Sequence, residues 1–292
     1  MRRLIIVVFT GLMMCLPGAH AADRGALFKL SAGGHTMHLF GTIHVGLPEY
    51  YPLEPRITAA VNGATVLALE VDPQADPVRM AEAIKTLATR DPVADPVPAA
   101  LAPRLDKTLR ASYVDPDAVV TFKPWLVATV MVMNEFALQG GRPDLSVEQH
   151  LATLARARNV PVMELESAQA QLALFNRLTP KQQWQYLDDT VSSFERGEQR
   201  AEIKQIMDAW ARADQAGLDA VAKRTEDDTT ASGQFMQKVL LEERNGPLAD
   251  KIAALLKKQD KAVAAIGVLH LLGKESVPAK LRARGIKVER IY

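Results

Sequence analysis

The sequence predicts an α/β protein with a central mixed β-sheet that is covered by helices. Short apolar runs cluster near the two ends of the chain, and a long helical region with a large helical insertion lies between them. The runs are nearly continuous instead of alternating between apolar and polar residues. Continuous runs are typical of strands buried on both faces, and such strands require helices on both sides of the sheet.

Six segments are expected to form strands. The first two are joined by Gly33-Gly34, which is a hairpin turn signal. The expected strands are residues 26–31, 36–43, 65–71, 160–165, 261–269 and 287–291. Because a sheet of usual size needs the strands from both ends, we expect residues 22–292 to form a single domain.

Two helical blocks separate these strands. The first block, at about residues 77–157, is the expected insertion, and its Asp-Pro steps divide it into short helices because the residue before proline disfavours the helical conformation. The second block runs from residue 168 to about residue 258. Within it, Thr179-Pro180 predicts a helix start, and Gly246-Pro247 predicts a helix break.

The N-terminus has the pattern of a secretory signal peptide. Arg2 and Arg3 precede an apolar run over residues 4–16, and Ala19-His20-Ala21 has the small residues of a cleavage site. We expect residues 1–21 to be removed after Ala21 and the protein to be exported, to a periplasm or out of the cell. The apolar run is shorter than the roughly 20 residues that span a bilayer, so no stable membrane span is expected after cleavage.

Composition and charge exclude several classes of protein. With 48% hydrophobic and 24% charged residues, the chain is not of a disordered or collagenous type. The 35 Lys and Arg residues are balanced by 34 Asp and Glu residues, so no positive surplus supports nucleic-acid binding. The single cysteine, Cys15, lies in the expected signal, which excludes thiol catalysis and leaves His, Asp and Glu for metal chemistry.

Four expected strands end in, or are followed by, a side chain that can bind a metal or move a proton. These side chains are His44, Glu70, Glu166 and His270. Ligands of open α/β sheets bind at the carboxyl ends of the strands, so we expect the four to meet at one site. Both histidines stand in a Gly-x-x-His pattern, which leaves space for another group to approach the strand end.

Short motifs in a specific order extend from about Leu27 to Tyr292. They are His38-Leu-Phe-Gly-Thr-Ile-His-Val-Gly46, Tyr51-Pro-Leu-Glu-Pro55, Leu69-Glu-Val-Asp72, Pro161-Val-Met-Glu-Leu-Glu-Ser167, Gln171-Leu-Ala-Leu-Phe175, Arg244-Asn245 and Gly267-Val-Leu-His-Leu-Leu-Gly273. In this set the sequence resembles the TraB/GumN family, which is related to the Tiki metalloproteases and more distantly to the erythromycin esterases. It departs from the family at Ser146-Val-Glu-Gln149, where a Gly-Val-Asp-Gln-like segment is usual.

The resemblance implies a divalent-metal-dependent hydrolase that acts on peptide bonds of a peptide or protein substrate. It assigns His44, His270 and Glu70 to the metal site, and two imidazoles with a carboxylate suit zinc, manganese or cobalt. The metal would activate a water molecule for attack on a carbonyl.

The resemblance also implies that Arg244 and Asn245 supply a cation and an amide beside the metal. Arg244 would suit an oxyanion or a carboxylate. For the two glutamates, the residues leave open whether Glu70 is a ligand or the base. We favour Glu70 as ligand and Glu166 as proton shuttle.

Two other functions stay open at this point. A metal-free esterase would use His44 as general base, oriented by Glu70. A protein of the same fold could instead bind a peptide or haem without turnover. Bound metal would distinguish the first of these from the metallohydrolase.

Overall fold

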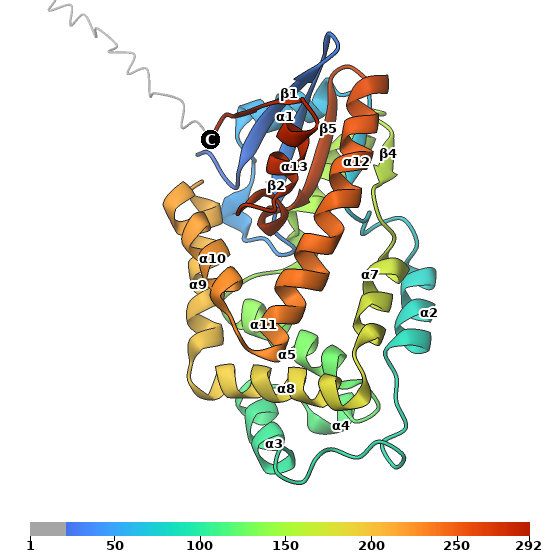
Figure 1. Ribbon diagram of the computed structural model, residues 1–292, viewed down its shortest axis with the longest axis vertical. Helices are drawn as coiled ribbons and strands as arrows, with labels where there is room; N and C mark the ends of the chain where they lie inside the picture. The colour runs from blue at the N-terminus through green and yellow to red at the C-terminus, as the bar shows by residue number, and fades with distance from the viewer. Residues whose placement is uncertain (1–21) are drawn as a thin grey trace, which may run out of the picture.

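The computed structural model describes residues 22–292 (Figure 1). The expected signal peptide, residues 1–21, lies outside the described residues. The predicted α/β class is confirmed, because six strands form one mixed sheet that helices cover. Within residues 22–292, no helix has both the length and the apolar character that crossing a membrane requires.

The sheet has the strand order β4-β3-β5-β2-β1-β6. Its strands are β1 (Leu27–Ala32), β2 (His35–Thr42), β3 (Leu67–Leu69), β4 (Val162–Glu164), β5 (Ala262–Gly267) and β6 (Lys287–Arg290). Strands β4, β3, β5 and β2 are parallel neighbours, whereas β1 runs antiparallel to both β2 and β6. The carboxyl ends of the four parallel strands therefore lie along one edge of the sheet.

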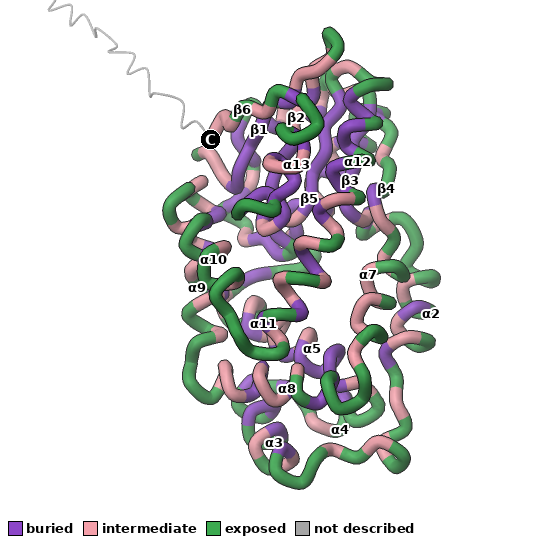
Figure 2. The backbone as a smooth tube through the Cα atoms, in the orientation of Figure 1, coloured by how far each residue is buried: buried purple, intermediate pink, exposed green. Residues whose placement is uncertain are grey.

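Local sequence explains the two most regular parts of the sheet. Strands β1 and β2 form the predicted hairpin, in which Gly33 and Gly34 have φ values of 59° and 84° that suit glycine. Strand β5 lies between β3 and β2, and Ala262 to Ile266 are fully buried. Figure 2 shows how burial is concentrated on the strands.

Helices cover both faces of the sheet. Helices α1 (Pro55–Asn62) and α6 (Val147–Ala157) pack together on one face, where they contact β5, β3 and β4. Helices α12 (Glu243–Lys258) and α13 (Val277–Ala283) pack on the other face, with α12 against β1, β2 and β5. The apolar side chains of these layers form the main hydrophobic core with the strands.

The other helices form a second part of the molecule beside the carboxyl edge of the sheet (Figure 1). Helix α5 packs on α8, with α3 and α11 also against α8 and with α2 against α7. Two smaller apolar clusters hold most of this part together, whereas buried side chains such as Met207, Trp210 and Leu218 belong to the main core. Its helices are α2 (Pro77–Leu87), α3 (Ala102–Ala111), α4 (Pro116–Val119), α5 (Pro124–Leu138), α7 (Ala168–Leu174), α8 (Pro180–Glu195), α9 (Glu198–Ala211), α10 (Gln215–Asp227) and α11 (Ala231–Phe235).

Short helical turns complete the chain. The 3-10 helices are η1 (Pro48–Tyr50), η2 (Pro143–Leu145), η3 (Phe175–Arg177) and η5 (Val268–Leu271), and η4 (Met236–Glu242) is a π-helix. The segment at 77–157 is thus divided, because its last helix, α6, belongs to the layer on the sheet and the rest to the helical part.

One predicted boundary is wrong. Helix α12 continues through Gly246-Pro247, although a break was expected there. Pro247 is the fifth residue of α12 and lies inside the helix, so it removes one backbone donor, and the packing of α12 against the core offsets that loss. The irregularity lies upstream instead, as the π-helix η4. The start predicted at Thr179-Pro180 is confirmed, since Thr179 caps α8 in a capping box with Gln182.

Candidate functional site

The four strand-end side chains predicted from the sequence lie at the same edge of the sheet. Glu70 follows β3 directly, and Glu166 and His44 each stand two residues after β4 and β2. His270 is three residues beyond the end of β5 and lies in the 3-10 helix η5. The parallel pairing of these strands is what brings the four segments together.

Glu70 is the buried centre of this arrangement, with 5% of its surface exposed. Its Oε2 accepts a hydrogen bond of 2.9 Å from the backbone N–H of Gly267, and its Oε1 accepts one of 2.8 Å from Gln171 Nε2. The guanidinium of Arg244 also contacts Oε1. Both carboxylate oxygens are therefore engaged by donors.

The surroundings of Glu70 favour its ionised form. Burial alone would raise the pKa of Glu70, but positive charge and the Gly267 N–H outweigh it and lower this pKa to about 2. A protonated His270 would contribute to that effect, but burial lowers the pKa of His270 to about 4, so its imidazole is neutral at pH 7. At neutral pH the positive charge that keeps Glu70 ionised comes from Arg244, with a further contribution from protonated His44.

Arg244 bridges the two glutamates of the site. Its Nη2 lies 2.5 Å and its Nε 3.1 Å from Glu166 Oε2, while Nη2 also contacts Glu70. Its Nη1 donates to the carbonyl oxygen of Leu240, in the π-helix η4, at 2.9 Å. Gln171 Nε2 donates to Glu166 Oε2 at 3.0 Å. The guanidinium therefore clamps the chain's own carboxylates.

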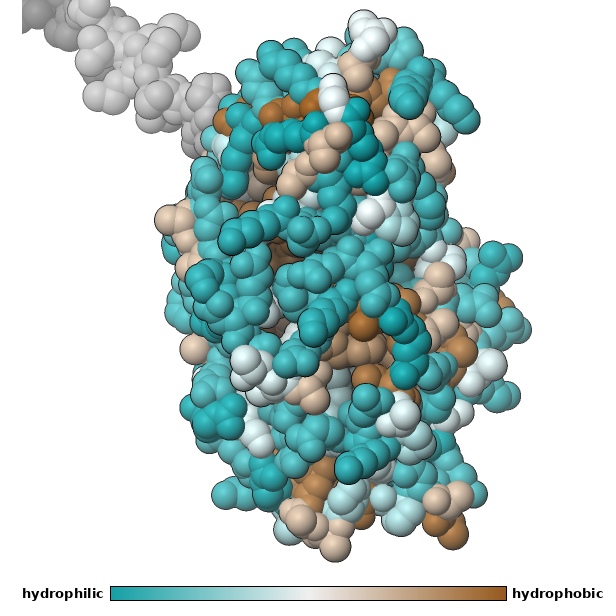
Figure 3. Space-filling model, in the orientation of Figure 1, coloured by the Kyte–Doolittle hydropathy of each residue, from teal (hydrophilic) through white to brown (hydrophobic). Residues whose placement is uncertain are grey.

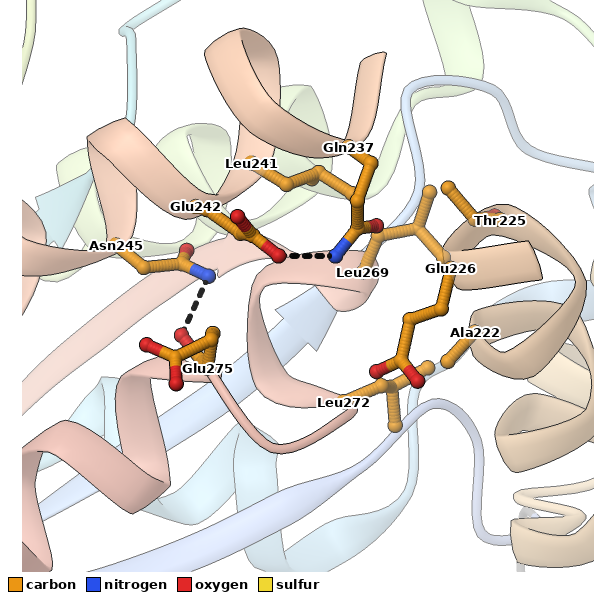
Figure 4. Close-up of a pocket in the computed structure, with 10 residues that line it drawn as sticks. All are labelled: Ala222, Thr225, Glu226, Gln237, Leu241, Glu242, Asn245, Leu269, Leu272 and Glu275. Atoms are coloured by element: carbon orange, nitrogen blue, oxygen red, sulfur yellow. Dashed lines mark hydrogen bonds between the residues drawn. The ribbon is translucent and has the colours of Figure 1, made fainter. Parts of the chain in front are cut away.

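His270 is held in one orientation from behind. Its Nδ1 lies 2.6 Å from Oδ1 of Asn245. Nδ2 of Asn245 donates to the carbonyl oxygen of Glu275 at 2.9 Å (Figure 4). The second contact assigns the amide orientation, so Oδ1 accepts and Nδ1 of His270 donates. The lone pair is then on Nε2, which lies 3.8 Å from Glu70 Oε2, too far for a direct hydrogen bond.

His44 is held in the same way by a residue outside the predicted set. Its Nδ1 lies 2.9 Å from Oε1 of Glu148, and the same oxygen accepts a hydrogen bond of 2.6 Å from Thr42. The side chain of His44 is 69% exposed, whereas that of Glu148 is 7% exposed. The negative charge of Glu148 raises the pKa of His44.

Glu148 stands in the first turn of α6, where the helix N-terminus favours a negative charge. Its Oε2 is buried and has no hydrogen-bond partner within residues 22–292. The sequence carried a signal for this residue, because it lies three residues before Leu151 on the buried face of α6. Gln171, the other residue missed as a site residue, stands first in the Gln171-Leu-Ala-Leu-Phe175 motif, but that motif gave it no role.

Two imidazoles and a carboxylate at one edge of the sheet are donors of the kind that a divalent cation needs. Metal-bound histidines usually donate their second ring N–H to an oxygen, and both His44 and His270 do so through Nδ1. Each thereby keeps Nε2 for a ligand, and Glu70 adds a carboxylate. The kinds of donor therefore fit a cation such as zinc. Across residues 22–292, however, no three His, Asp or Glu side chains already gather closely enough to hold a metal, so the exposed His44 would have to move.

The fold and the site define an α/β protein with paired strand-end histidines beside a glutamate–arginine cluster. The chain belongs to the TraB/PrgY/gumN family, whose model matches residues 26–290. Two relatives, each named uncharacterized protein YbaP, come from Escherichia coli strain K12 and Shigella flexneri. Each is 26% identical over 250 residues, which cover 86% of this chain and 89% of the relative. No solved structure matches the chain.

Proposed function

We propose that the protein is an exported hydrolase that cleaves peptide bonds with a water molecule activated at His44, His270 and Glu70. The observation that carries this proposal is the state of the two imidazoles. Each is fixed through Nδ1 to a side-chain oxygen, so in each ring Nε2 is the nitrogen left for a ligand at the edge where Glu70 lies. Purely structural histidines have no need of this shared orientation.

In this proposal His44, His270 and Glu70 hold a divalent metal ion, which would lower the pKa of a bound water to roughly 7. Asn245 and Glu148 orient the imidazoles, and their side chains do not touch the substrate. Arg244 keeps Glu70 ionised at neutral pH. Because both oxygens of Glu166 contact Arg244, we assign Glu166 to positioning that guanidinium in place of proton transfer.

A metal-free hydrolase is the second candidate, and the His44–Glu148 pair favours it. Nε2 of His44 would take a proton from water as the oxygen adds to the carbonyl, and Glu148 would stabilise the resulting imidazolium. Glu148, not Glu70, is then the residue that orients His44. Since Glu148 raises the pKa of His44, the rate of this route would increase with pH until His44 is deprotonated.

The two candidates are tested by incubating the purified protein with a peptide library and detecting products by mass spectrometry. Wild type is compared with the His44→Ala/His270→Ala variant and with His35→Ala, which removes an imidazole bonded to Leu256 instead. The proposal expects cleavage by wild type and by His35→Ala, loss in the double variant, and loss on chelation that added metal reverses. Cleavage that resists chelation supports the metal-free route, and equal products from all three proteins would refute both.

A further inference from the structure

A cavity of about 630 Å³ lies beyond His44, on the side of β1. The loop that follows β2 and carries His44 continues into its wall, where Leu47 and Tyr50 lie. Helix α9 forms the opposite wall through Met207, whose carbonyl oxygen accepts a hydrogen bond from Tyr50. Trp210, one turn further along α9, donates to the carbonyl oxygen of Gly41 in β2. The cavity therefore lies next to the strand-end residues of the site, on the far side of His44.

Part of the lining of the cavity is apolar. Leu47, Tyr50, Leu138 and Met207 contribute to its lining, and Leu138 leaves 43% of its surface exposed. Exposure of a leucine beside other apolar side chains is a feature of ligand sites, which combine apolar walls with a few polar groups. A volume of this size accommodates a small organic molecule or a short peptide.

Two of the charges around the cavity neutralise each other. Lys204 and Asp208 lie one turn apart on α9, and their Nζ and Oδ2 atoms are 2.7 Å apart. Both charges of this pair line the cavity and offset each other there, whereas Glu135, the ion-pair partner of Arg200, is not among the lining residues. Arg200 and Glu49 are the other two charged residues in the lining.

Arg200 has terminal nitrogens that can bind an anion. Its Nε lies 2.9 Å from Oε1 of Glu135, a side chain that is only 4% exposed, while Arg200 itself is 71% exposed. Gln139 links the two by donating to Oε1 of Glu135 and to the carbonyl oxygen of Arg200. Among the described residues, neither terminal nitrogen of Arg200 has a hydrogen-bond partner, and Glu49 has no ion pair. A fixed guanidinium with free terminal N–H groups matches a carboxylate.

We propose that this cavity binds a short peptide with an apolar side chain and two free ends. Arg200 binds the carboxylate, Glu49 binds the ammonium group, and Leu47, Leu138 and Met207 receive the side chain. The inference rests on the proposed function in one respect, the origin of the ligand. A peptide hydrolase would supply it as the end of a substrate or as a product. Binding itself requires no turnover, so it can be measured separately.

The test is isothermal titration calorimetry with leucyl-leucine, its C-terminal amide and its N-acetyl derivative. The His44→Ala/His270→Ala protein is used, so that the probes stay intact whether or not the wild type is a hydrolase. Loss of a charge-assisted hydrogen bond weakens binding by roughly tenfold or more. We therefore expect the amide and the N-acetyl derivative each to bind at least about tenfold more weakly than leucyl-leucine.

Arg200→Gln added to this protein should make leucyl-leucine and its amide bind equally, whereas the matched variant Lys204→Gln should preserve their difference. Glu49→Gln should likewise remove the preference over the N-acetyl derivative, and it does not disturb the buried Glu135. Equal binding of all three probes, or no heat from leucyl-leucine at millimolar concentration, would overturn the proposal. If the peptide library is not cleaved but the protein still prefers leucyl-leucine over its amide and its N-acetyl derivative, the binding site is supported and only the proposed hydrolase is refuted.

Discussion

Nδ1 of His44 lies 2.9 Å from Oε1 of Glu148, so a carboxylate from α6 orients the histidine that follows β2. The relationship joins a solvent-exposed imidazole to a buried acid. Because of it, the two histidines of the site differ in protonation. His44 has a raised pKa and His270 a lowered one, so in the absence of a ligand His44 holds a proton at a pH where His270 has lost its own.

Replacing Glu148 with Gln should lower the pKa of His44 toward the ordinary value for histidine, because the variant removes the negative charge and keeps a hydrogen-bonding side chain. NMR titration of the imidazole C–H signals measures this pKa. Glu164→Gln is the control, since Glu164 lies on β4 and accepts from the backbone N–H of Asp72. An unchanged His44 titration in Glu148→Gln would contradict the assigned pair.

Replacing Asn245 with Asp should raise the pKa of His270 from about 4, because a carboxylate at that position stabilises the imidazolium. Replacing it with Ala should release the ring and mix its two tautomers. Imidazole nitrogen chemical shifts report both changes, and the wild type should show the proton on Nδ1. A wild-type proton on Nε2 would be incompatible with the hydrogen-bond assignment.

Replacing Arg244 with Met should destabilise the fold at pH 7 by about 3–5 kcal/mol, because it leaves the buried carboxylate of Glu70 without its cation. Urea denaturation followed by circular dichroism measures the free energy of unfolding. Arg177→Met removes an exposed ion pair with Glu243, in which both side chains are 50% exposed, and should cost less than about 1 kcal/mol. Equal losses in the two variants would argue against a buried Arg244–Glu70 pair.

The ionised state of Glu70 should also appear in the pH dependence of stability. A carboxyl group whose pKa is lowered to about 2 in the folded protein contributes stability above its unfolded pKa of about 4.3 and loses that contribution as the pH falls toward 2. The difference in unfolding free energy between wild type and Glu70→Gln should therefore shift in favour of the variant as the pH falls from 5 to 2. A difference that does not vary with pH would rule out an ionised Glu70.

The arrangement of the sheet and the position of the site follow from short-range patterns. Apolar runs identified six strands, and the side chains at their ends identified the edge where His44, Glu70, Glu166 and His270 lie. Periodicity and strand ends are visible in a single sequence because each is a property of a few adjacent residues.

The surface is a different matter. Hydrophobic residues show through near the middle of the face in Figure 3, between hydrophilic ones, and no local pattern predicted that arrangement.

What the sequence could not reveal depends on contacts between distant segments. Glu148 comes near His44 only because α6 packs beside the end of β2, and the two residues are far apart in the chain. Gln171 reaches two glutamates across the turn after β4. At Pro247 the local rule for a break was overridden by the packing of α12, which buries Leu248 and Ile252 against the core.

The central claim is that His44, His270 and Glu70 form one water-activating centre with a divalent metal ion. The most direct measurement is the metal content of the purified protein by mass spectrometry after exposure to zinc, manganese and cobalt, for wild type and for His44→Ala/His270→Ala. The account predicts about one metal ion per wild-type chain and near absence from the folded double variant. Equal content in the two proteins, whether both are empty or both are loaded, would contradict it.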